Sequence, residues 1–280
     1  MAETNYSVLM SVYIKESPDY FKQSLDSILG QTVPSDDIVI IKDGPQSPEV
    51  EKLLSEYAER FPAIHIYGYE KNMGLGHALN TGLTLCKNEL VARMDTDDIA
   101  FPERCEKQLA VFAERPELDI VGSSLVEFIG TPDNLVAYKH MPAEYADILK
   151  YAKRRNPFNH PTVMYKRHVV IESGGYEECS RAEDFGLFTK MVFEGRKGYN
   201  LPEPLLKYRA DANMIKRRQS KPETKVVIRI AKRNYKCGYI GWFDYAALVL
   251  MQMTNHLLPT KIAGWIFRHR YRTPIQRQKQ

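Results

Sequence analysis

Short apolar runs and helix-type repeats alternate through the first hundred residues, and this alternation limits the fold more than any other feature of the sequence. The strand-type runs span residues 6–13, 37–42, 64–69 and 90–94. Ser-Pro pairs at 17–18 and 47–48 predict helix starts between them, because Ser caps a helix and Pro suits its first turn. Such alternation predicts an α/β fold with a doubly wound, mostly parallel sheet flanked by helices.

Polar or acidic residues follow all four of these predicted strands. In doubly wound sheets, ligands bind in the crevice beyond the carboxyl ends of the strands. We therefore expect a ligand site at this edge of the sheet. Its candidate residues, in chain order, are Tyr13 and Glu16, then Asp43, then Asn72 and Gly74, and finally Asp95, Asp97 and Asp98.

The residues Asp95, Asp97 and Asp98 place three carboxylates within four positions, directly after a strand. Repulsion among them destabilises such a cluster unless a cation or strong hydrogen-bond donors compensate. The alternative is a helix cap, with Asp97 or Asp98 heading the helix expected near Pro102. Oxygen ligands suit Mg²⁺ or Mn²⁺, which commonly bridge to phosphates. The cluster therefore favours a metal-bound nucleotide diphosphate.

Two other segments of this edge have more than one interpretation. Asp43 can accept hydrogen bonds from a nucleotide base, but Asp43-Gly44 is also an ordinary turn dipeptide. The segment 72–82 (NMGLGHALNTG) does not complete the GxGxxG dinucleotide fingerprint. Its glycines instead predict a close backbone approach where a helix begins near the ligand.

Length and composition exclude several classes of protein. With 280 residues, 44% hydrophobic and 26% charged, the chain can bury a sizeable core, which argues against a disordered tail, a coiled coil or a small disulfide scaffold. The four cysteines are far apart and have no histidine at metal-ligand spacing, so we expect reduced, mostly buried thiols. The N-terminus lacks the pattern of a signal peptide. These features predict a cytoplasmic protein.

Charge is distributed unevenly along the chain. Residues 1–213 hold 24 basic and 33 acidic side chains, whereas residues 214–280 hold 15 basic and 2 acidic ones. Basic tails of this kind usually contact an anionic polymer or a membrane surface. Within this tail, residues 238–258 form the most apolar stretch, which polar side chains interrupt. Its uncharged run, residues 245–260, is shorter than the roughly 18 residues that indicate a spanning helix.

We expect this apolar stretch to be an interfacial helix on a membrane, because basic side chains flank it and tryptophans suit the headgroup zone. The alternative is a helical hairpin packed on the body of the protein with its basic face in water. The flanking residues are Arg229, Lys232, Arg233 and Lys236 on one side, Arg268, Arg270 and Arg272 on the other, and the tryptophans Trp242 and Trp265.

Five motifs in order resemble those of family 2 glycosyltransferases, and most closely the bacterial members that build capsule, exopolysaccharide or O-antigen. The resemblance covers roughly residues 6–210. It implies a GT-A fold, an inverting transfer from a nucleotide sugar that is usually UDP-linked, and a divalent metal, Mn²⁺ or Mg²⁺. The motifs are SVY with Glu16, IKDG at 41–44, NMGLGHALNTG at 72–82, MDTDD at 94–98 followed by Pro102, and Gly174-Gly175-Tyr176 followed by Arg181-Ala182-Glu183-Asp184.

The resemblance also assigns roles on the donor side. It implies that the base and ribose contact Tyr13, Glu16 and Asp43, with Asn72 and Gly74 beside them. The DxD-type motif implies that Asp95 and Asp97 hold the diphosphate and that Asp97 and Asp98 hold the metal. One departure concerns the base site, because Lys42 and Pro45 stand where the family often has Asp and Ser.

On the acceptor side, the resemblance implies that Asp184 is the catalytic base, and a helix cap is the alternative. Further candidates have equally open alternatives. His160 contacts substrate or is structural, and Arg209, or the basic run 216–218, meets diphosphate or is solvated. The Gly174-Gly175-Tyr176 segment places a ring against a sugar or forms a turn with a core tyrosine. The acceptor-side candidates are His160, Gly175, Tyr176, Glu183 and Arg209.

These features predict an inverting glycosyltransferase that moves a sugar to a lipid-linked or growing glycan acceptor in bacterial surface polysaccharide synthesis. Residues 1–213 are the expected catalytic domain, with the nucleotide sugar on roughly 1–100 and the acceptor on roughly 101–213. Residues 214–280 are the expected membrane-associating helical extension. We therefore expect a peripheral protein on the inner face of the cell membrane, without a nucleic-acid partner.

Three other functions compete with this prediction, and nucleic-acid binding by the basic tail is one of them. A sugar nucleotidyltransferase also combines a doubly wound sheet with acidic metal ligands. It would need a glycine-rich phosphate loop after the first strand, and residues 13–18 contain no glycine. A nucleotide-sugar-binding protein without activity would have no use for Asp184 in addition to the acidic cluster.

Overall fold

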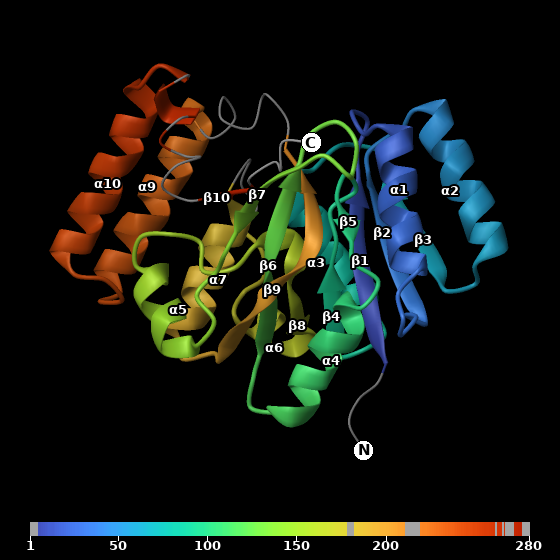
Figure 1. Cartoon of the computed structure of the whole chain (residues 1–280), viewed down its shortest axis with the longest axis horizontal. Coiled ribbons are helices and arrows are strands. Elements are labelled where there is room, and N and C mark those ends of the chain that lie inside the picture. Colours follow the sequence, from blue (N-terminus) through green and yellow to red (C-terminus); the bar gives the residue numbers. More distant parts are fainter. Residues whose placement is uncertain are drawn as a thin grey trace.

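The computed structural model describes residues 5–177, 182–210, 219–260, 262–264, 266 and 272–275. Within this part, ten strands form one sheet (Figure 1). The strands are β1 (Tyr6–Val12), β2 (Asp37–Asp43), β3 (Ile64–Tyr69), β4 (Leu90–Arg93), β5 (Ile99–Ala100), β6 (Ile120–Phe128), β7 (Leu135–Lys139), β8 (Met164–Lys166), β9 (Gly198–Arg209) and β10 (Thr273–Pro274).

Helices alternate with the first strands, as the local sequence predicts. The hydroxyls of Ser17 and Ser47 accept backbone N–H groups in the first turns of α1 (Pro18–Leu29) and α2 (Pro48–Arg60). Proline occupies the first position of both helices, which confirms the predicted starts. The other helices are α3 (Leu75–Leu85), α4 (Arg104–Glu114), α5 (Tyr145–Ala152), α6 (Arg167–Glu172), α7 (Glu183–Phe193), α9 (Lys221–Lys236) and α10 (Trp242–Leu257), with a 3₁₀ turn η1 (His160–Thr162).

The sheet has a parallel half and a mixed half. Its main order is β10-β7-β6-β8-β4-β1-β2-β3, and β9 pairs with both β5 and β6. The neighbours β4, β1, β2 and β3 are parallel, which confirms the predicted doubly wound unit. Beyond β4, strand β8 runs antiparallel, so the sheet becomes mixed. The carboxyl ends of β1 to β4 therefore share one edge.

Apolar side chains cover both faces of the sheet. Along β1, Val8 and Met10 point into a core shared with α1, α2 and α4, whereas Leu9 points into a second core shared with α3, α5, α6 and α7. This alternation is the period of two that a strand buried on both faces requires. The two layers of helices hold the strand ends in place.

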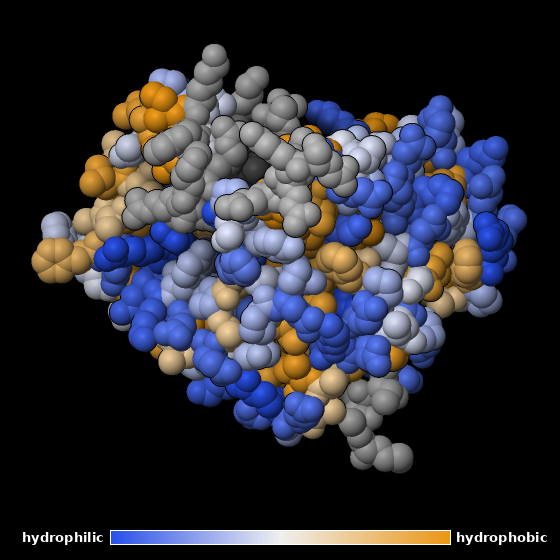
Figure 2. Space-filling model, viewed as in Figure 1, coloured by the Kyte–Doolittle hydropathy of each residue, from blue (hydrophilic) through white to orange (hydrophobic). Residues whose placement is uncertain are grey.

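The helices α9 and α10 stand side by side at the end of the molecule opposite α2 (Figure 1). Val227 and Ile230 of α9 pack against Phe185 of α7 and Leu248 of α10. The expected alternative of a hairpin packed on the body is thus observed for α9. Apolar side chains gather over the outer side of α10 (Figure 2).

Residues near the C-terminus return to the sheet. Strand β10 pairs antiparallel with β7, and Arg272 Nε lies 2.5 Å from Oε1 of Glu127 on β6. Both side chains are buried, so Arg272 cannot also face a membrane, which corrects that expectation. Among the cysteines, Cys86 and Cys105 are buried free thiols and Cys237 is exposed.

Candidate active site

The loops at the carboxyl edge of the sheet are joined in pairs. Glu16, after β1, accepts a hydrogen bond from the hydroxyl of Thr96, after β4. Asp43, at the end of β2, accepts the backbone N–H groups of Met73 at 2.6 Å and Gly74 at 3.0 Å, after β3. The structure thus brings the predicted donor-side residues together, and these contacts hold the loops at fixed separations.

Two donor-side residues differ in exposure. Tyr13 has 43% of its surface exposed at the rim, where a flat ligand could stack on its ring. Asp43 is buried, and Asn72 Nδ2 also donates to its carbonyl oxygen, 3.2 Å away. Asp43 therefore shapes the loop that begins α3, in addition to any contact with a base.

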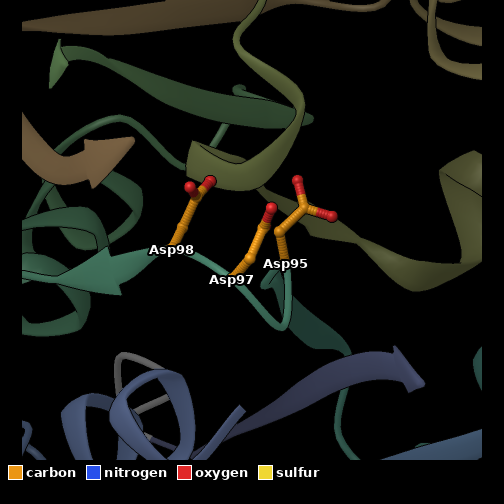
Figure 3. Close-up of side chains that lie close together, drawn as sticks. All are labelled: Asp95, Asp97 and Asp98. Carbon is orange, nitrogen blue, oxygen red and sulfur yellow. The ribbon is translucent and has the colours of Figure 1, made fainter. Parts of the chain in front are cut away.

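The acidic cluster lies on the loop between β4 and β5. One carboxylate oxygen each of Asp95, Asp97 and Asp98 lies within 4.8 Å of the others, and the three side chains point toward a common space (Figure 3). The helix-cap alternative is wrong for this loop, because β5 follows it and α4 begins only at Arg104. Three carboxylates on one short loop are thus free to share one ligand.

Burial and mutual repulsion disfavour the charged forms of Asp97 and Asp98. Burial first, and then the charges of Asp95 and Glu16, raise the pKa of Asp97 to about 7. Burial, with the charges of Asp97 and Asp95, raises the pKa of Asp98 well above its usual range. Within the described chain, Oδ2 of Asp98 is buried without a hydrogen-bond partner. These residues fit a divalent cation, since a bound cation would stabilise all three carboxylates.

A buried arginine forms an ion pair with the acidic cluster, and the sequence analysis did not identify it. Arg93, the last residue of β4, places Nη2 2.5 Å from Oδ1 of Asp95, and its side chain is only 2% exposed. Its Nε and Nη1 are buried and have no hydrogen-bond partner in the described part of the chain. A basic residue at the end of a buried strand, two positions before an acid, was the available signal.

Arg209 is buried against the acidic loop, and its predicted contact with diphosphate stays a prediction. Its guanidinium is buried and donates to the carbonyl oxygens of Asp97 (2.8 Å) and Gly130 (3.3 Å) and to Oε1 of Gln23 (2.9 Å). Its Cζ lies 3.7 Å from the centroid of the Tyr20 ring. The hydrogen bonds use one N–H of each guanidinium nitrogen, and they hold the acidic loop in place. The run 216–218 lies outside the described residues.

Asp184 lies in the first turn of α7, on a different element from the acidic cluster. Its Oδ2 accepts from Asn156 Nδ2 at 2.6 Å, and its Oδ1 accepts the N–H of Phe185 at 2.7 Å. The cap of α7 is Ala182, in the left-handed region with φ 59°, so Asp184 is not the cap residue. Burial first, and then Asp184, raise the pKa of the adjacent Glu183 to about 7.

Three acceptor-side candidates lie in or against the core. Tyr176 is 1% exposed, and its hydroxyl lies 3.3 Å from both His160 Nε2 and the hydroxyl of Tyr165. Burial and the charge of Arg93 hold the pKa of His160 well below its usual range. Gly175 has φ 69°, and an added Cβ would meet Asn80 at 2.5 Å. These positions correct the expectation of a tyrosine ring facing a sugar and support the turn with a core tyrosine.

Other residues named in the sequence analysis cannot be placed. Arg181, Trp265, Arg268 and Arg270 lie outside the described residues, and so does the fourth cysteine, Cys179. Among the described residues, no helix combines the length and the hydropathy needed to span a bilayer.

A sheet with clustered acidic side chains beyond its strand ends is typical of α/β enzymes and binding proteins that hold phosphate-bearing nucleotides. The family model for glycosyl transferase family 2 matches residues 7–174. The chain belongs to this family, and it is a glycosyltransferase of the GT-A fold.

Two relatives and one solved structure indicate the range of similar proteins. The chain is 35% identical over 263 residues to the Escherichia coli UDP-Gal:alpha-D-GlcNAc-diphosphoundecaprenol beta-1,3-galactosyltransferase, covering 94% of this chain and 95% of that one. It is 34% identical over 262 residues to the amylovoran biosynthesis glycosyltransferase AmsE of Erwinia amylovora, covering 94% and 97%. A fragment of S. aureus TarS in complex with UDP-GlcNAc superposes with a TM-score of 0.65 at 16% identity, covering 95% of this chain and 76% of that one.

Proposed function

We propose that this glycosyltransferase moves a hexose or N-acetylhexosamine from a UDP-sugar to a lipid-linked or growing glycan, with inversion, in bacterial surface polysaccharide synthesis. The observation that carries the proposal is the convergence of Asp95, Asp97 and Asp98 at the carboxyl edge of the sheet, with a further carboxylate, Asp184, on a separate helix. Residues 1–213 form the catalytic domain in this proposal, and residues 214–280 form its extension.

The donor would lie along the carboxyl edge of β1 to β4. Tyr13, Glu16 and Asp43 would contact the base and ribose, and the loop of Asn72 and Gly74 would lie beside them. The names of the Escherichia coli relative and of the TarS complex support a UDP-linked donor. The departures at Lys42 and Pro45 concern the base site alone, where Lys42 is paired with Glu51.

The diphosphate end of the donor would meet the acidic cluster. Asp97 and Asp98 would hold Mn²⁺ or Mg²⁺, and Asp95 would face the diphosphate, with Arg93 holding its carboxylate in place. When bound, such a cation neutralises the charge that develops on a departing diphosphate. Arg209 keeps the main chain of this loop fixed, so the three carboxylates would be arranged before the donor arrives.

Asp184 would take the proton from the acceptor hydroxyl. A general base must reach that proton directly, at about 2.6–3.2 Å between heavy atoms. Asn156 and the backbone N–H of Phe185 each hold one oxygen of Asp184, and an ionised carboxylate accepts about four hydrogen bonds. Attack on the face opposite the diphosphate would invert the anomeric carbon.

The lipid-linked acceptor suggests where the extension lies. Phe243, Leu250 and Leu257 are spaced by seven residues along α10 and are 80%, 67% and 77% exposed. They form an outward apolar row, and Trp242, which precedes Phe243 in the chain, is 60% exposed. An exposed apolar row with lysines near it suits the headgroup region of an anionic membrane. The row supports peripheral attachment to the inner face of the cell membrane.

Only some of the expected cations are available for that surface. Arg233 is paired with Glu177, and Arg272 is buried beside Glu127, so both already have an acidic partner. Of the other expected cations, Lys232 and Lys236 of α9 are exposed and would supply the attraction. We therefore expect the apolar row to contribute more to attachment than the positive charge does.

A donor screen tests the proposal. Purified protein is mixed with Mn²⁺ or Mg²⁺ and a panel of UDP-, GDP- and dTDP-sugars, and both donor hydrolysis and thermal stabilisation are recorded. We expect metal-dependent stabilisation and slow hydrolysis with a UDP-sugar. Stabilisation without turnover, even with lipid-linked acceptors, would favour a binding protein. Formation of a sugar nucleotide from a sugar phosphate and UTP would favour a nucleotidyltransferase.

A further inference from the structure

Glu177 lies where α3, α7 and α9 meet. Its carbonyl oxygen lies so close to Gly76, in the first turn of α3, that an added Cβ would be 2.5 Å away. Its side chain lies against Gly186 of α7, where an added Cβ would be 2.6 Å from Oε1. Its carboxylate is ion-paired with Arg233 of α9 and lies 3.2 Å from Arg229. Glu177 thus joins the donor side, the helix of Asp184 and the extension.

Arg233 continues this connection into α7. Its Nη2 donates to the carbonyl oxygen of Gly186 at 3.0 Å, two residues after Asp184. Ile230, one turn earlier, belongs to the same apolar cluster as Phe185, the residue that follows Asp184. One face of α9 therefore holds the first turn of α7 by charge and by apolar packing.

The first turn of α10 makes a second connection to the same carboxylate. Asp244 Oδ1 lies 2.8 Å from Nη2 of Arg154, on the segment after α5. Two residues later, Asn156 donates to Asp184 Oδ2 at 2.6 Å. The extension thus contacts both the helix that carries Asp184 and the segment that donates a hydrogen bond to it.

We propose that Arg233 and Asp244 are positioning residues for Asp184, so that the α9–α10 hairpin completes the catalytic site as well as facing the acceptor side. The inference rests on the proposed role of Asp184 as the base. Proton transfer tolerates little displacement, and a shift of about 1 Å at a reacting group can reduce turnover about 100-fold. An ion pair that contributes little to stability can therefore matter for turnover.

Exposure separates this role from a purely stabilising one. The side chain of Arg233 is 35% exposed and that of Asp244 is 20% exposed. Ion pairs with access to solvent contribute little to the free energy of unfolding, because water screens their attraction. Removing either pair should therefore leave the fold and the donor side intact while Asp184 loses its fixed position.

The test compares Arg233→Met and Asp244→Asn with two matched controls, in solution without vesicles. Lys225→Met removes an exposed cation from the same helix, and Asp147→Asn removes an exposed carboxylate from α5. We expect both test variants to lose about tenfold or more in kcat, with the donor KM and UDP–Mn²⁺ binding within about twofold of the wild type. Arg233→Lys should recover part of kcat, and both controls should behave as the wild type.

Hydrogen exchange gives a readout that does not need turnover. Amides of residues 183–188 should exchange faster in Arg233→Met and Asp244→Asn, while those of β1 and β4 stay unchanged. Unaltered kcat in both variants would overturn the inference, and so would an equal loss of UDP–Mn²⁺ binding. If the wild-type protein shows no turnover, the proposed function has failed, and the exchange of residues 183–188 decides the positioning role alone.

Discussion

The backbone N–H of Arg209 donates a hydrogen bond to Oδ1 of Asp98 at 2.8 Å, although 111 residues separate them in the sequence. This bond fastens the end of β9 to the acidic loop. The guanidinium of the same residue holds the carbonyl oxygen of Asp97, so one residue fixes two of the three cluster positions. The geometry of the candidate metal site therefore depends on a strand made much later in the chain.

Replacing Arg209 with Met should loosen the acidic loop. The variant keeps the N–H bond to Asp98 but leaves the carbonyl oxygen of Asp97 without its donor, whereas water can replace the donor to Gly130, which is exposed. One unsatisfied buried group costs about 1–3 kcal/mol, so the free energy of unfolding should fall by about that amount. UDP–Mn²⁺ affinity, measured by calorimetry, should fall as well. Unchanged affinity would show that the loop holds its shape without Arg209.

Substituting the cluster itself should abolish binding of the metal-bound nucleotide. Asp97→Ala and Asp98→Ala should each stop transfer and remove the thermal stabilisation that UDP with Mn²⁺ gives the wild type, because each removes a cation ligand. Asp133→Ala, at an exposed carboxylate on another loop, is the control and should keep both properties. Full metal-dependent stabilisation of both cluster variants would contradict the assignment.

Asp184→Asn should separate binding from chemistry. The amide keeps the shape of the side chain but cannot accept the acceptor proton, so turnover should fall by roughly 10²- to 10⁴-fold. Donor affinity should stay near the wild-type value, since Asp184 lies on α7 and the cluster lies on the β4–β5 loop. Near-normal turnover would exclude Asp184 as the base, and lost donor affinity would make it a binding residue.

Glu183 should make stability depend on pH. Its pKa is raised to about 7 by burial and by Asp184, so between about 4.5 and 7 the folded protein holds a proton that the unfolded chain has released. The free energy of unfolding should therefore fall as pH rises through this range. Glu183→Gln should remove the contribution of Glu183 and leave that of Asp97, whose pKa is also raised to about 7. The variant should therefore be more stable than the wild type at pH 8, with the two converging below about pH 4.5.

Urea unfolding of both proteins at several pH values measures this difference. Glu59→Gln, at an exposed position on α2, is the control and should follow the wild-type curve. Parallel curves for wild type and Glu183→Gln between pH 5 and pH 8 would contradict the prediction.

The apolar row of α10 should control attachment to vesicles. Phe243→Ser and Leu257→Ser each remove an exposed apolar side chain, and the double variant should pellet much less with anionic liposomes than the wild type. Ile171→Ser, at a 47% exposed isoleucine on α6, is the control. Wild-type binding should weaken but persist at high salt, because apolar burial is not screened. A double variant that pellets like the wild type would exclude the row as the contact.

Local rules were sufficient for much of the fold. Ser17 and Ser47 reveal their helices because cap and proline act within four residues, and the runs of β1 to β4 need no distant information. The acidic cluster was predictable for the same reason, since three carboxylates lie together in sequence. Parallel pairing then followed from the alternation, which brought the predicted strand ends to one edge.

Long-range contacts account for what the sequence did not reveal. Arg209 and Arg233 both carry ordinary basic side chains, and nothing near them in sequence shows that they turn inward. Their acceptors, the Asp97 carbonyl and Glu177, lie more than 50 positions away. The position of Tyr176 was unpredictable for the same reason. The sequence of a tyrosine after two glycines is the same whether its ring contacts a sugar or packs in the core.

The ion pair of Glu127 with Arg272 affects the order in which parts of the sheet fold during synthesis. The two residues are 145 positions apart, so at about 5–20 residues per second Arg272 is made roughly 7 to 30 s after Glu127. During that interval Glu127 lacks its counter-charge and β7 lacks its neighbour β10. The parallel half of the sheet, whose strands are close in sequence, can form on the ribosome first. Strand β7 can pair with β10 only after the ribosome has made β10.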